Sequence, residues 1–123
     1  MAYEEKIQQI TLEADGDQSA NQYKFMVLGA DGVALNTTAG GACVGVLQNK
    51  PTDTQSAIIA VGGVAKVEAG DAVARGADVQ SNATGLAITA AAADFSQGTA
   101  LAAAAAAGDI IPVLLRPNAQ NNA

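Results

Sequence analysis

The chain has 123 residues, the size of one domain, and twelve acidic against six basic residues give it a formal net charge of −6. Because phosphate binding needs a clustered basic surface, this charge argues against DNA, RNA and anionic membranes as partners. Half of the residues are hydrophobic, but many are alanine, with two Phe, two Tyr and no Trp. Large side chains supply most of the burial energy, so we expect a thin core that gains stability from assembly.

The first 22 residues are predicted to form a polar approach to the domain. Its segment 7–12 fits either a short strand or one helical turn. The apolar side chains in this polar approach favour a contact surface for another protein, and we predict that surface at Tyr3, Ile7, Ile10 and Leu12. The same residues equally fit the first strand of the domain's own sheet. With no apolar signal region at its start, the chain is expected to be made in the cytoplasm.

Short valine-rich segments separated by Gly-Asp and Gly-x-Asp turns dominate the rest of the chain. Glycine supplies the backbone freedom of tight turns, Asp hydrogen-bonds its own backbone there, and β-branched residues favour strands. The predicted fold is therefore all-β, a small barrel or sandwich of short strands. In chain order the strands are expected at residues 23–28, 33–35, 42–48, 57–61, 64–67, 72–74, 79–80, 86–89 and 110–115.

The alanine run at residues 99–107 has the highest helix propensity in the chain. As a helix it would present only Leu101 as a large apolar side chain and would have no stripe to bury. We expect strand, loop, Gly-Asp turn and strand over residues 98–111. The domain is predicted at 23–115, between the arm (or first strand) at 1–22 and a polar tail at 116–123.

Alternation and apolar runs predict which side chains form the core. The predicted core residues are Phe25, Val27, Val44, Val46, Ile58, Val61, Val64, Val67, Val73, Ile111, Val113 and Leu115.

The residues that could carry catalysis or bind a metal are few. The chain has no histidine, and its single cysteine, Cys43, lies in an apolar run that is typical of a buried core thiol. Most of the Asp residues fit turns, and Asp15 and Asp17 lack the remaining ligands of an EF-hand calcium loop. We predict a protein that is not an enzyme, with no catalytic, cofactor-binding or metal-binding residues.

Several turns in order resemble the small capsid decoration, or cement, proteins of tailed bacteriophages. The segments are GVLQNKP at 45–51, GVAKV at 63–67, GDAV at 70–73 and NATGLA at 82–87, with GTAL at 98–101 and AGDII at 107–111 closing the series. The resemblance implies an all-β domain on the outer surface of an icosahedral head, self-associating as a homotrimer and stabilising contacts between major capsid protein subunits. Pro112 departs from the pattern and suggests an edge strand or a bulge.

The main alternative is a carrier domain of the biotinyl or lipoyl type. Those small barrels also contain a phrase like VEAGDAV at 67–73, and Lys50 stands upstream at a plausible distance for the modified lysine. Its neighbours Asn49 and Pro51 differ from the setting that the modifying enzymes recognise. An enzyme subunit with Cys43 as nucleophile is a third possibility, which lacks an activating base.

Overall fold

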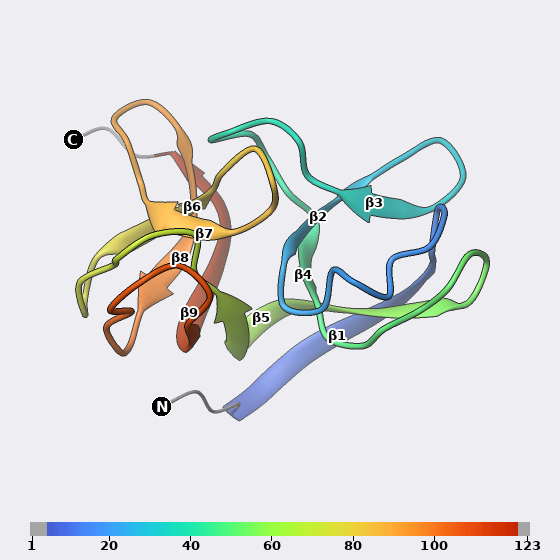
Figure 1. Ribbon diagram of the computed structural model, residues 1–123, viewed down its shortest axis with the longest axis horizontal. Coiled ribbons are helices and arrows are strands. Elements are labelled where there is room, and N and C mark those ends of the chain that lie inside the picture. Colours follow the sequence, from blue (N-terminus) through green and yellow to red (C-terminus); the bar gives the residue numbers. More distant parts are fainter. Residues whose placement is uncertain (1–4, 121–123) are drawn as a thin grey trace.

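The computed structural model describes residues 5–120, which form nine β-strands joined by turns and loops (Figure 1). The described residues include no helix, and hence none long and apolar enough to cross a membrane. The predicted all-β class is confirmed. The strands are β1 (Glu5–Glu13), β2 (Phe25–Leu28), β3 (Val33–Leu35), β4 (Gly45–Leu47), β5 (Ser56–Glu68), β6 (Asp78–Ser81), β7 (Ala87–Thr89), β8 (Phe95–Ala100) and β9 (Ile110–Gln120).

One antiparallel sheet joins all nine strands and curls into a half-barrel. The strand order is β3-β2-β4-β5-β9-β8-β6-β7, and β1 pairs with β5 outside this path. Figure 1 shows β5 crossing the molecule between two groups of strands, with β1 to β4 on one side and β6 to β9 on the other. The strand β5 is therefore shared by both halves of the sheet.

Two predicted strands, at residues 57–61 and 64–67, form the single strand β5 instead. The Gly62-Gly63 pair between them is not a turn. Gly63 has a φ of 77° and continues the strand with a local irregularity, which is how glycine interrupts a strand without ending it. Residues 5–13 of the predicted arm form β1, and residues 116–120 of the predicted tail continue β9.

Pro112 was expected at an edge or a bulge, and the expectation is wrong, because β9 lies between β5 and β8. Its C=O accepts the N–H of Leu101 at 2.9 Å, and Leu101 is one residue beyond the end of β8. Proline is tolerated at this point because the ladder with β8 has already ended there.

Where β2, β4 and β5 lie side by side, the sheet is buried on both faces at residues 25–26, 46–47 and 59–60. Each contributes two consecutive residues, one to each of two apolar clusters, because neighbouring side chains of a strand point to opposite faces. The first cluster contains Phe25, Val46 and Ala60 from these strands, and the second contains Met26, Leu47 and Ile59. The register agrees, since Val46 pairs with Ala60 and Leu47 pairs with Ile59.

The core prediction is right for eight residues, and two more, Val44 and Val61, are partly buried and pack against the second cluster. The eight buried residues are Phe25, Val46, Val64, Val67, Val73, Ile111, Val113 and Leu115. The prediction is wrong for Val27 and Ile58, which are only partly buried. A prediction from alternating residues assumes that one face of a strand is exposed to solvent, and this assumption fails where both faces are buried. Buried side chains that the prediction missed include Met26, Val33, Leu47, Ile59 and Val79.

The alanine run follows the predicted course of strand, loop, turn and strand. Thr99 and Ala100 end β8, the loop makes a single bridge from Ala104 to Val73, and β9 begins at Ile110. The predicted strand at 72–74 is reduced to that bridge. Its neighbours Ala72 and Ala74 are exposed, so the segment has no second row of side chains to bury.

Side-chain amides tie the loop at residues 36–44 to the other half of the sheet. Asn118 accepts the Cys43 N–H at 2.8 Å through Oδ1 and donates to the Cys43 C=O at 3.0 Å through Nδ2. Gln97, which is only 2% exposed, donates to the same Oδ1 at 3.0 Å and accepts the Asn118 N–H at 3.2 Å. Asn36 donates to the Ser81 hydroxyl at 2.7 Å. These bonds satisfy buried polar groups, and those of Cys43 and Asn36 join the loop at 36–44 to strands with which it shares no ladder.

Gly45 tests the close approach of β4 to β5. A Cβ at this position would lie 2.3 Å from the Ala60 carbonyl oxygen, which a backbone atom cannot relieve by rotating. We expect Gly45→Ala to lower the free energy of unfolding by about 1–3 kcal/mol, measured by denaturant unfolding. Gly41→Ala is the control, because its Cβ would meet Thr38 at 3.2 Å, and it should cost less. Equal stability of the two variants would contradict the close approach.

Substitutions of Asn118 test the side-chain hydrogen bonds that join Asn118 to Cys43 and Gln97. Its φ of 59° suits Asn or Gly, so Asn118→Gly keeps the backbone conformation and removes the side-chain hydrogen bonds, with some added entropy of the unfolded chain. We expect it to lower the free energy of unfolding by about 1–3 kcal/mol, because buried groups of Cys43 and Gln97 lose their partners. Asn118→Ala should lose the same bonds and in addition place a Cβ at positive φ, which strains the backbone by about 1–2 kcal/mol. A glycine variant as stable as the parent would show that these bonds add nothing.

Candidate interaction surface

Of the four predicted contact residues, three lie in β1 and Tyr3 lies outside the described residues. Ile10 pairs with Ile59 and Leu12 pairs with Ala57, so both share the face of β5 that carries the second cluster. Leu12 is partly buried against that cluster, and Ile10 is 39% exposed. Ile7 lies in the same strand. Their role as a contact surface stays a prediction.

The outer edge of β1 has no partner strand among residues 5–120, since β1 pairs with β5 alone. The Ala14 N–H donates to the Gln55 C=O at 2.9 Å, so the backbone groups of Ala14 face the β5 side. Because bonding groups alternate sides along a strand, the N–H and C=O groups of Gln9 and Thr11 point away from β5. Both residues are exposed.

A shallow, mainly apolar hollow of about 420 Å³ opens near the end of β2. Val27 and Leu28 form one wall and Ala42, Cys43 and Val44 another, with Asn118 also lining the hollow. Leu28 is 65% exposed, against 37–39% for the other exposed large apolar side chains of the described region. The sequence predicted Leu28 as a strand residue but gave no sign of this exposure, and Asn118 lay in the predicted polar tail.

Acidic side chains gather on three loops at one end of the molecule. The loop at 14–19 contacts the β4–β5 loop, because the Gly16 N–H donates to Asp53 Oδ1 at 3.0 Å. It also contacts the β2–β3 turn, where the Asp15 N–H donates to the Val33 C=O at 2.9 Å. The Ser19 hydroxyl and N–H hold the pKa of Asp17 below its usual value. Glu13 ends β1 next to the first loop and Asp31 lies within the β2–β3 turn, so carboxylates dominate this end.

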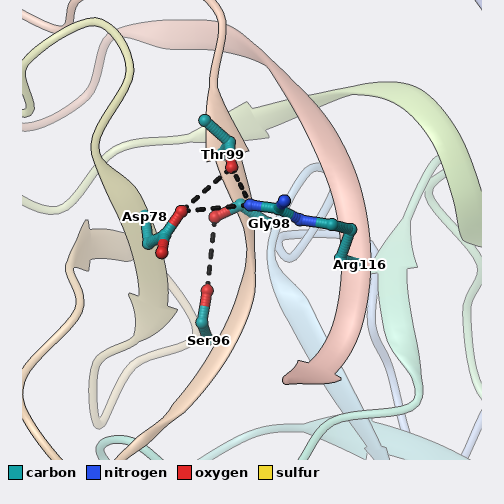
Figure 2. A network of polar contacts seen from close by, with 5 residues as sticks. All are labelled: Asp78, Ser96, Gly98, Thr99 and Arg116. Atoms are coloured by element: carbon teal, nitrogen blue, oxygen red, sulfur yellow. Dashed lines mark hydrogen bonds and ion pairs between the residues drawn. The ribbon is translucent and has the colours of Figure 1, made fainter. Parts of the chain in front are cut away.

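A second polar cluster lies on the opposite half of the sheet, across β6, β8 and β9 (Figure 2). Asp78 pairs with Arg116 at 3.1 Å and accepts the Thr99 hydroxyl at 2.9 Å, and Arg116 also donates to Thr99. Asp78 belongs to one of the predicted Gly-x-Asp turns, at residues 76–78, but begins β6 instead. The side chains of Arg116 and Asp78 are 55% and 47% exposed, so this ion pair adds little to the stability of the fold.

The chemically reactive side chains are separated from one another. Cys43 is 4% exposed, and burial raises the pKa of its thiol to about 12, so the thiolate is scarce near neutral pH. Lys50 is exposed in the β4–β5 loop. No group of three or more acidic, Cys or His side chains within residues 5–120 is arranged to hold a metal ion.

The chain matches the family described as "Phage cement protein" over residues 5–115. Among solved structures it is similar to the "head fiber gp8.5 N base in bacteriophage phi29", with a TM-score of 0.68 at 12% sequence identity. The match covers 93% of this chain and 100% of that chain, and at this identity it speaks for the fold alone. No curated protein matches the chain significantly. Because the family match spans most of its length, this chain belongs to the phage cement protein family and is a non-enzymatic structural component of a phage capsid.

Proposed function

We propose that this protein binds the outer surface of an icosahedral phage head and stabilises contacts between major capsid protein subunits. A protein that binds only the assembled head stabilises that state by mass action. Such a role needs a rigid body and exposed contact surfaces, and no chemistry. The family supports capsid protein as the partner.

The observation that carries the proposal is the open edge of β1. The register irregularities of β1 lie between Glu5 and Gln9, and its charged residues are Glu5, Lys6 and Glu13. Between them the residues at 9–12 are Gln-Ile-Thr-Leu, with no charge and no proline, and they pair with β5 in regular register. Natural proteins usually protect a long edge with charges, prolines or bulges, because an open edge accepts further strands. An extended segment of the capsid protein can add there, with main-chain hydrogen bonds to Gln9 and Thr11. The exposed side chain of Ile10 would add apolar contact.

Self-association as a homotrimer is part of the same proposal. Eight of the 22 buried hydrophobic residues in the described region are alanine, so the core of one copy contributes modest burial energy. Additional burial between copies would compensate. Sedimentation of the purified protein tests the trimer, which would have three times the 12.2 kDa mass of the chain.

The carrier-domain alternative has no observation in its favour. Exposure of Lys50 is ordinary for a lysine in a loop, and family membership assigns the chain to capsid proteins. An adduct on Lys50, seen by intact mass after expression with an active ligase, would restore it.

Proline at position 11 tests strand addition on heads that lack decoration. Thr11→Pro removes an N–H that points away from β5, so the β1–β5 ladder is kept while a new strand loses its bond. We expect the parent protein to co-sediment saturably with heads and Thr11→Pro to bind about tenfold more weakly. Thr11→Ala is the control, because it changes the exposed side chain and keeps the N–H.

A parent protein that ignores the heads would overturn the proposed function. Saturable binding that Thr11→Pro leaves intact, in a variant with unchanged thermal unfolding, would keep the function and reject the β1 edge as the contact.

A further inference from the structure

Leu28 is the most exposed large apolar side chain of the described region, and the fold around it is fixed. It ends β2. The Val44 N–H donates to the Met26 C=O at 2.8 Å, and beyond this bond residues 27–28 and 42–43 separate from each other. The hollow opens where the two segments separate. Asn118 holds the backbone of Cys43 on the far wall through two hydrogen bonds. The hollow is therefore formed before any partner arrives, which lowers the cost of binding.

The charge around this end of the molecule limits what can occupy the hollow. Gly29, next to Leu28, lies against the Asp15 carboxylate, 2.7 Å from where a Cβ would be. The adjoining loops, within residues 13–19, 28–33 and 49–55, carry five carboxylates and one lysine. Their net charge of −4 is two thirds of the −6 of the whole chain. A positively charged partner is attracted to such a surface and an acidic one is repelled.

We infer that the Leu28 hollow is a second docking site for the capsid protein, and that it takes an extended segment with one large apolar side chain flanked by Lys or Arg. The apolar side chain would fill the hollow against Leu28 and Val44, and the basic residues would lie over Asp15 and Asp31. A second copy of this chain is a poor occupant, because each copy has a net charge of −6 and only six basic residues, so it offers little positive charge to this surface.

The site continues the surface proposed for the β1 edge, since Glu13 ends β1 and Asp15 follows it. The inference therefore rests on the proposed function and adds to it a charge requirement on the partner. It also separates two kinds of contact, because strand addition at β1 depends on main-chain bonds and the hollow depends on side chains and charge.

Two pairs of variants test the site by co-sedimentation with undecorated heads over a series of salt concentrations. Leu28→Ser should weaken binding about tenfold, because it removes the apolar contact. Leu114→Ser is its control, since Leu114 is 39% exposed on β9 and does not line the hollow. Asp31→Asn should weaken binding about two- to fivefold at low salt and flatten the salt dependence. Asp71→Asn, in an exposed turn of the other half, should change neither.

The outcomes distinguish this site from the proposed function. If the parent protein binds heads and Leu28→Ser and Asp31→Asn bind equally well, the site is overturned and the function is kept. Failure of the parent protein to bind would overturn both. A change in oligomeric state by Leu28→Ser, with head binding per protomer unchanged, would make the hollow a contact between copies and reject the capsid protein there. Unfolding scans of each variant guard against misfolding, and Asp31→Asn decides alone if Leu28→Ser does not fold.

Discussion

Burial of both faces of the β2, β4 and β5 segment is the constraint on which the rest of the structure depends. Consecutive residues such as Ile59 and Ala60 enter different clusters, so this short segment is the wall between two cores. Burial on both sides requires close strand approach, and Gly45 provides it where the Ala60 carbonyl leaves no room for a Cβ. The two half-sheets can then share β5 without a closed barrel. Small buried side chains fit this arrangement, because alanine lets backbone layers approach where larger residues would hold them apart.

The fold class followed from local chemistry, and the burial pattern did not. Glycine and Asp marked the turns, and short segments that contain Val or Ile marked β2, β3, β6 and β7 near their observed limits. Alternation wrongly assigned Val27 and Ile58 to the core, because a strand segment that is buried on both faces has no regular alternation of polar and apolar residues. The joining of two predicted strands into β5 was hidden by Gly62 and Gly63, which usually signal a turn. Local sequence cannot separate a glycine irregularity inside a strand from a hairpin when the partner strands are unknown.

The functional surface was less predictable than the fold. Apolar residues in a polar segment singled out Ile10 and Leu12, and both lie on β1. The hollow at Leu28 depends on Asn118, which is ninety residues away and reaches Cys43 through side-chain bonds. Such a long-range tie leaves no periodic signal, since a single Asn in a polar stretch is compatible with any exposed role. Gathering of the acidic residues likewise results from three loops that meet only in the folded chain.

An ordered strand and a flexible arm have different consequences for a protein that must hold a capsid together. Fixing one residue of a flexible arm costs about 1–2 kcal/mol of conformational entropy, so an arm of several residues loses much of its contact energy on binding. Residues 5–13 are already ordered by the ladder with β5, and that cost is met when the domain folds. The same holds for the hollow, whose walls are fixed by Asn118. On binding, only the partner segment then loses conformational entropy. The remaining binding energy of each added strand is available to stabilise the assembled head.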